Sequence, residues 1–106
     1  MRLALVCAFC LLASASPSWS VTLNSEGCGL YAVWSGSVVW ARQVGADREK
    51  VRVSLVELND DDTSGAIGLV LKDVDKLWAT SAPWASVMQI VYRDCIRRRG
   101  VYGTGA

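Results

Sequence analysis

Two cysteines, Cys28 and Cys95, constrain the fold of this chain more than any other pair of residues. They lie 67 positions apart in a chain of 106 residues, so a bond between them would enclose most of the folded part. In the chain-entropy model, a covalent loop of this size contributes about 4 kcal/mol, which is comparable with the net stability of a small domain. Whether they form a disulfide or remain two buried free thiols depends on the compartment in which the chain folds.

The N-terminus indicates that compartment. Arg2 is followed by an eleven-residue apolar run over 3–13, which is typical of a secretory signal peptide. The run is too short for a membrane-spanning helix, which needs about 20 apolar residues. Small residues predict cleavage after Ala15, and an alternative cut follows Ser20. We therefore expect export into an oxidising space, and no stable membrane insertion after cleavage.

Removal of the leader simplifies the cysteine chemistry. Cys7 and Cys10 form a C-x-x-C pattern, but they lie inside the apolar run and would leave with residues 1–15. The mature chain then contains Cys28 and Cys95, for which one intramolecular pairing exists, and we expect them to be bridged. We assign residues 21–99 to a single small secreted domain and the glycine-rich residues 100–106 to a flexible tail.

Composition excludes several functions. The 11 basic and 10 acidic side chains leave a net charge of +1, far from the basic surface that nucleic-acid binding requires. The chain has no histidine, so Ser-His-Asp and Cys-His catalysis and histidine-bound zinc are excluded. A domain of this size also leaves little room for a substrate cleft between paired carboxylates. We expect neither an enzyme nor a bound cofactor.

The first half of the mature chain reads as β-structure. Residues 30–44 are rich in β-branched and aromatic side chains and are interrupted at Ser35-Gly36, which predicts a hairpin turn. Residues 51–58 begin with strict alternation, and 66–71 form another apolar run after the polar loop 59–65. These patterns predict two antiparallel hairpins, with 21–24 as a further edge strand.

The segment 81–99 is ambiguous. At helical spacing, Trp84, Val87, Val91 and Cys95 share a face, whereas at strand spacing Met88 and Tyr92 fall on a common side. The strand interpretation leads to a mainly-β domain. The helical one leads to an α+β fold, with two hairpins and a C-terminal amphipathic helix over about 82–98.

The chain also resembles an immunoglobulin variable-type domain. Cys28 is followed by Trp40 in Trp40-Ala41-Arg42-Gln43, similar to the family's W-x-R-Q, and Cys95 falls at the distance of the family's second cysteine. Residues 69–74 are similar to its L-x-L-x-x-V strand, and 102–105 resemble its final [FW]-G-x-G. The resemblance implies a small sandwich of antiparallel strands with Trp40 in the core. We take this mainly-β sandwich as the expected fold.

Asp60, Asp62 and Ser64 stand at positions 1, 3 and 5 of a calcium-loop pattern, with Gly65 at position 6. Leu71 then replaces the glutamate that the loop needs at position 12. A solvated loop is the alternative to a weak calcium site.

Two further groups could bind or be recognised. Trp78 and Trp84 flank a loop-like segment and could form an exposed platform for a partner. Arg97, Arg98 and Arg99 are either a solvated basic end or a protease processing site.

We expect a secreted extracellular binding or recognition module without catalytic activity, whose partner is an extracellular protein or a glycan. The alternative is a secreted precursor or regulatory peptide that is processed at Arg97–Arg99.

Overall fold

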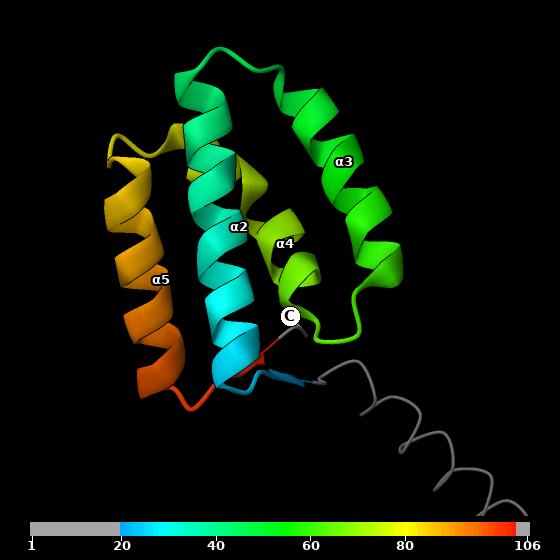
Figure 1. Ribbon diagram of the computed structural model, residues 1–106, viewed down its shortest axis with the longest axis vertical. Coiled ribbons are helices and arrows are strands. Elements are labelled where there is room, and N and C mark those ends of the chain that lie inside the picture. Colours follow the sequence, from blue (N-terminus) through cyan, green and yellow to red (C-terminus); the bar gives the residue numbers. More distant parts are fainter. Residues whose placement is uncertain (1–19, 104–106) are drawn as a thin grey trace, which may run out of the picture.

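The computed structural model describes residues 20–103, which form four helices and one small sheet (Figure 1). Of the described residues, 73% are helical, so the expected mainly-β sandwich is wrong. The hairpins of the α+β alternative are also absent from this part of the chain. The predicted signal peptide, Cys7 and Cys10, and residues 104–106 lie outside the described residues.

Helix α2 spans Ser25–Gln43 and replaces the first predicted hairpin. Its N-cap is Asn24, whose side chain accepts a hydrogen bond of 2.8 Å from the backbone N–H of Gly27. Its buried residues recur at helical spacing, on a face that includes Cys28, Ala32, Ser35 and Val39. The β-branched content of this segment suggested strands, but a packed helical face outweighs such a weak local preference.

Ser35-Gly36 is therefore a helix–helix contact and not a turn. Helix α5, Trp84–Arg97, lies against α2 at this point. A Cβ atom on Gly36 would overlap the Met88 side chain and stand 3.1 Å from the carbonyl oxygen of Trp84. Ser35 is fully buried, and its hydroxyl has no hydrogen-bond partner in the part of the chain that the structure describes. Small residues are needed here because they let the two helices approach closely.

Helix α3, Arg48–Asp61, replaces the predicted strand 51–58. Asp47 starts it by accepting a hydrogen bond of 3.0 Å from the backbone of Glu49. The alternation that suggested a strand does not match burial, because Val53 is exposed whereas Leu55 is buried. Val51, Leu55 and Leu58 stand at helical spacing and line the side of α3 that faces α2.

Helix α4, Ala66–Ala79, replaces the predicted strand 66–71 and continues well beyond it. It contacts both α2 and α3. The predicted C-terminal helix over 82–98 agrees with α5 within two residues at its start and one at its end. This is the one helix that the sequence pattern located, because its apolar residues recur at helical spacing over four turns.

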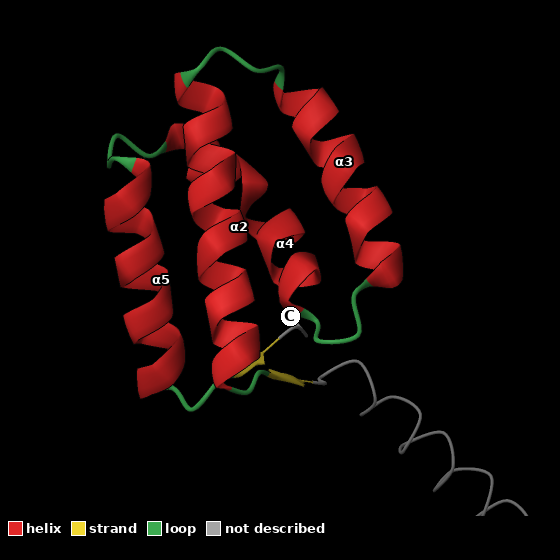
Figure 2. Ribbon diagram, in the orientation of Figure 1, coloured by secondary structure: helices red, strands yellow, loops and turns green. Residues whose placement is uncertain are grey.

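The two ends of the described chain are joined beside α2 and α5 (Figure 2). The expected Cys28–Cys95 disulfide is present and links α2 to α5. Strands β1, Ser20–Thr22, and β2, Val101–Gly103, pair antiparallel, with Val21 opposite Tyr102. Residues 101–103, which we had assigned to a flexible tail, are thus part of the fold.

Gly100 makes this junction possible. Its φ of +74° is left-handed, and a Cβ atom there would overlap the backbone of Leu23. Its carbonyl oxygen accepts a hydrogen bond of 2.9 Å from Leu23, and its N–H donates one of 2.8 Å to Cys95.

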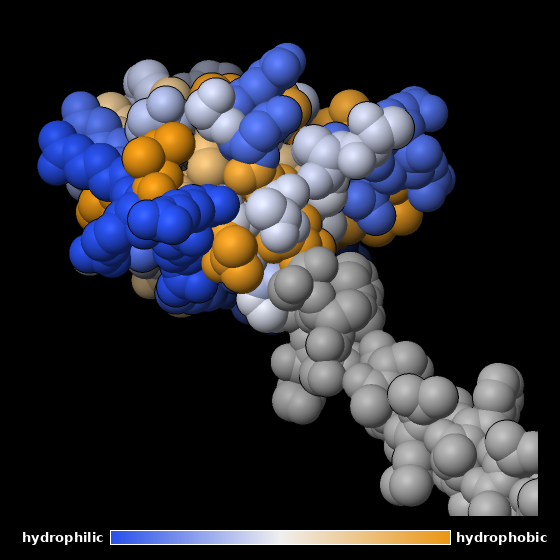
Figure 3. Space-filling view, turned by 90° about the horizontal axis from the view of Figure 1, so that it is seen from below, coloured by the Kyte–Doolittle hydropathy of each residue, from blue (hydrophilic) through white to orange (hydrophobic). Residues whose placement is uncertain are grey.

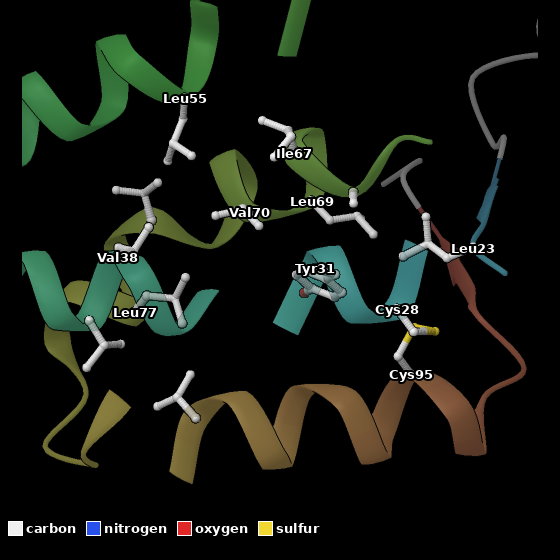
Figure 4. Close-up of a cluster of buried hydrophobic side chains, with 14 residues drawn as sticks. Leu23, Cys28, Tyr31, Val38, Leu55, Ile67, Leu69, Val70, Leu77 and Cys95 are labelled. Atoms are coloured by element: carbon white, nitrogen blue, oxygen red, sulfur yellow. A yellow bond between two sulfur atoms is a disulfide. The ribbon is translucent and has the colours of Figure 1, made fainter. Parts of the chain in front are cut away.

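The core lies among the helices (Figure 4). Leu55 of α3, Val70 of α4, and Val38 and Tyr31 of α2 converge there, and the disulfide closes one end. Trp40, which the immunoglobulin resemblance placed in the core, is 52% exposed. The expectation for Trp40 is therefore wrong.

Candidate functional site

A groove of about 830 Å³ lies between α4 and α5. Both helices pack on α2 but have few contacts with each other, and Tyr31 of α2 lines the groove between them. Tyr102 of β2 lines the same groove. The volume falls within the range of small-ligand sites in proteins, which is roughly 300–1,000 Å³.

The groove lining contains both apolar and charged residues. Leu77, Ala79, Ala82 and Val87 lie near the α4–α5 connection. From there the chain runs along α5 to Arg97, which is ten residues beyond Val87, or about 15 Å along a helix. Five charged residues also line the groove, two from α4 and three from α5: Asp73, Lys76, Arg93, Asp94 and Arg97.

Tyr31 and Asp73 are hydrogen-bonded in the groove. The Tyr31 hydroxyl donates to the Asp73 carboxylate. Burial raises the pKa of Tyr31, and the hydrogen bond to Asp73 raises it further. Tyr31 therefore stays protonated near neutral pH and serves as a fixed donor to Asp73.

Asp94 is held by two arginines. Arg97 and Arg98 each donate to its carboxylate over 2.8 Å. The bond from Arg97 lowers the pKa of Asp94 below its ordinary value, and the Arg98 bond acts in the same direction. Asp94 is thus a carboxylate whose charge is compensated by its neighbours.

Tyr102 connects this ion cluster to Tyr31. The guanidinium carbon of Arg98 lies 4.6 Å from the Tyr102 ring centroid, within cation–π range. The rings of Tyr102 and Tyr31 meet edge to face with centroids 5.3 Å apart. Burial raises the pKa of Tyr102, and the negative charge of Asp94 contributes to the shift.

Two cations of the groove remain uncompensated. Lys76 on α4 and Arg93 on α5 form no ion pair with any residue between 20 and 103. The lining has three basic residues, Lys76, Arg93 and Arg97, and two acidic ones, Asp73 and Asp94, so its formal charge is positive. Hydrophilic surface gathers at the end of the molecule where α5 finishes (Figure 3).

The predicted calcium residues have another role. Asp62 accepts hydrogen bonds from the backbone N–H groups of Ser64 and Ile67, both over 3.0 Å, and from the Ser64 hydroxyl over 2.7 Å. The Ser64 hydroxyl in turn accepts one of 3.1 Å from Ala66. These bonds cap the start of α4. Asp60 is exposed near the end of α3, and residues 20–103 contain no cluster of three metal-ligating side chains.

The two tryptophans differ in exposure. Trp78 is partly buried against the core, whereas Trp84 is 43% exposed at the start of α5. Neither side chain lines the groove. The groove residues themselves were missed, although Asp73, Lys76, Leu77 and Thr80 follow helical spacing and a helix prediction for α4 would have grouped them.

The arginine cluster is part of the folded structure. Arg97 ends α5, Arg98 is its C-cap, and Arg99 adopts a positive φ of 57° before the buried Gly100. A protease that cleaves after Arg99 would have to extract a peptide bond whose next residue is hydrogen-bonded to both Leu23 and Cys95.

No helix within residues 20–103 has the length and apolar character needed to cross a bilayer. Comparisons with protein-family models, with curated proteins and with solved structures find no match for this chain.

Proposed function

We propose that this chain is a secreted, disulfide-bonded binding protein and that the α4–α5 groove is its ligand site. The observation that carries the proposal is the groove itself, about 830 Å³ of open space between two helices that are both anchored on α2. Its lining combines apolar surface with a few charged groups, as small-molecule sites do.

Binding has more support than catalysis. The two carboxylates in the groove are already engaged, Asp73 with Tyr31 and Asp94 with Arg97 and Arg98. The pKa of Asp94 is lowered, which makes it a poor proton donor near neutral pH. A general acid–base pair would need two groups whose pKa values are shifted apart and which are free to reach a substrate.

A release of peptide at Arg97–Arg99 has less support, because these residues end a helix and precede a buried glycine. Export is supported by the N-terminal apolar run and by the Cys28–Cys95 bond, which persists in oxidising compartments.

Export is tested by expressing the full chain in cells with a secretory pathway and measuring the intact mass of the product in the medium. We expect cleavage after Ala15 or Ser20 and no free thiol. A chain that stays in the cytosol with residues 1–20 attached and both thiols free would overturn this part of the proposal.

Ligand binding is tested with Nile red, an uncharged apolar dye, on the oxidised mature protein. Ile90 lines the groove and is 62% exposed, so Ile90→Glu should abolish dye binding without unfolding the chain. Ile96 lies on the same helix, is 44% exposed and does not line the groove, so Ile96→Glu is the matched control. Equal dye binding by both variants, or none by the unmodified protein, would refute the groove as the site.

A further inference from the structure

We infer that an exposed side of α2 is a dimer interface, and that its partner is a second copy of this chain. Four apolar side chains of α2, each 39–59% exposed, define this side: Leu30, Val33, Trp40 and Val44. We call these four residues the α2 stripe. None of them lines the α4–α5 groove, so the inference goes beyond the proposed function and leaves the ligand site free.

The α2 stripe belongs to a helix segment without charge. Residues 27–41, about four turns, contain no Asp, Glu, Lys or Arg. A helix that packs on one side only normally carries charged residues on its other side, whereas a helix that is apolar all round is buried all round. In Figure 1, α2 lies in front of α4, with α5 and α3 on either side and no described element over its near side. The composition of α2 therefore indicates a contact that one copy of the chain does not supply.

The stripe follows one line along α2. Leu30 precedes Val33 by three residues, Trp40 follows Val33 by seven, and Val44 comes four residues later, which are the spacings of one helical face. A helix that lies on a membrane surface has a similar apolar face but carries Lys or Arg beside it. Residues 27–41 lack both. An uncharged protein surface therefore fits the stripe better than lipid headgroups do.

Helix α5 extends this face. Met88 and Cys95 mark the side of α5 that contacts α2, and Asp94 lines the groove to one side of it. At about 100° per residue, Tyr92 and Ile96 fall to the other side of the contact. They are 42% and 44% exposed, and neither lines the groove. These two side chains therefore border α2 on its uncovered side.

The exposed area is sufficient for a weak dimer. From their exposed fractions, the four stripe residues with Tyr92 and Ile96 present roughly 600 Å² per copy, so a symmetric pair would bury about 1,200 Å² in total. This is the lower limit of specific interfaces. It is also as large a patch as monomeric proteins commonly leave open.

The stripe is complementary to itself. In an antiparallel pair of α2 helices, a two-fold axis beside Ser37 sets Val33 of one copy opposite Trp40 of the other. The same register sets Val44 opposite Gly29, where nothing lies within 4 Å of an added Cβ atom. A larger residue thus meets a smaller one at each step. Ser37 donates its hydroxyl to the Val33 carbonyl oxygen over 2.8 Å, so its burial at the axis leaves no donor unpaired.

Sedimentation equilibrium of the oxidised mature protein tests the inference. We expect a dimer with a dissociation constant of about micromolar order, because the interface is small. Val33→Glu should weaken it by about 100-fold, since each dimer would then bury two charges. Val53 of α3 is outside the stripe and similarly exposed, at 54% against 47% for Val33, so Val53→Glu is the matched control. This control should dimerise as the parent does, and both variants should keep the parent's circular dichroism spectrum.

Crosslinking tests the register. Ser37→Cys places one thiol of each copy beside the two-fold axis, so a short bismaleimide should join two copies of this variant. Val53→Cys should react with the same reagent without joining two copies. Crosslinking of Val53→Cys as efficiently as Ser37→Cys would refute the stripe as the interface.

The other failures are equally distinct. A protein that stays monomeric at about 100 times the expected dissociation constant, or a dimer that persists in Val33→Glu, would overturn the inference. A monomer that binds phosphatidylcholine vesicles, with the binding lost in Val33→Glu, would also overturn it, because the stripe would then face lipid. Nile red binding that depends on Ile90 is independent of these outcomes, so the proposed function can stand where the dimer fails.

Discussion

Helix α5 has two contrasting sides. Toward α2 it is in close contact, with Met88 against Gly36 and with a covalent bond from Cys95 to Cys28. Toward α4 it borders an open groove that carries unpaired charge. The tight side holds α5 in place, whereas on the other side Lys76 and Arg93 line the groove and form no ion pair within residues 20–103. One helix thus combines a rigid contact with a border of the open groove.

Removing the disulfide, which fixes the tight side of α5, should lower the stability of the protein more than any other change proposed here. Replacing both cysteines, Cys28→Ser with Cys95→Ser, should lower the free energy of unfolding by about 4 kcal/mol, because the unfolded chain regains the entropy of a large loop. Urea unfolding measures the difference, and the unmodified protein in reductant should show the same loss. A change below about 1 kcal/mol would mean that packing alone holds α5 on α2.

Adding a side chain at the close α2–α5 contact should cause the second largest loss of stability. Gly36→Ala should cost about 1–3 kcal/mol, because the added Cβ meets both Met88 and the backbone of Trp84. Gly29 lies on the same helix with nothing near its Cβ position, so Gly29→Ala should instead stabilise by about 0.5–1 kcal/mol. Thermal unfolding of the two variants gives the comparison. Equal shifts of the same sign would rule out a tight α2–α5 contact at Gly36.

The smallest effect concerns the start of α4, the other wall of the groove. Asp62→Ala should cost about 1 kcal/mol at neutral pH, because three donors to its carboxylate lose their partner. Burial acts to raise the pKa of Asp62, but hydrogen bonds from Ile67 and Ser64 outweigh it and bring the pKa below the ordinary 3.8.

The lowered pKa of Asp62 determines how its contribution to stability depends on pH. A carboxylate with a lowered pKa in the folded state contributes stability above its unfolded pKa and loses it as the pH falls through the folded pKa. The difference between the parent protein and Asp62→Ala should therefore be largest near neutral pH and vanish in strong acid. Asp60→Ala, two positions earlier and exposed, should change stability by less than about 0.5 kcal/mol at any pH. A pH-independent loss in Asp62→Ala would argue against capping by its charged form.

The sequence contains helix-cap residues, but they stand next to segments whose β-branched content predicts strands. Asn24 and Asp47 are the N-caps of α2 and α3, and each accepts a backbone hydrogen bond at the start of its helix. Such residues are typical helix caps, and they indicate two starts that the β-branched runs obscure. The alternation over 51–55 fitted a strand because short apolar patterns often satisfy both periods.

The candidate site was harder to predict from the sequence than the fold was. The spacing of Asp62 and Ser64 predicts calcium ligands because both side chains carry oxygen atoms. In the structure the same oxygen atoms accept hydrogen bonds from backbone N–H groups at the start of α4. Lys76 and Arg93 showed no local pattern that set them apart from other surface cations. They matter because two helices place them across one groove.

The covalent link between Cys28 and Cys95 and the extent of α5 follow from features that are local or countable: two cysteines in the expected mature chain, and an apolar face repeated over four turns. The groove does not follow from such features. It exists because α4 and α5 both pack on α2 and have few contacts with each other. That arrangement depends on side-chain volumes, such as the absent side chain of Gly36, which act between segments far apart in the chain.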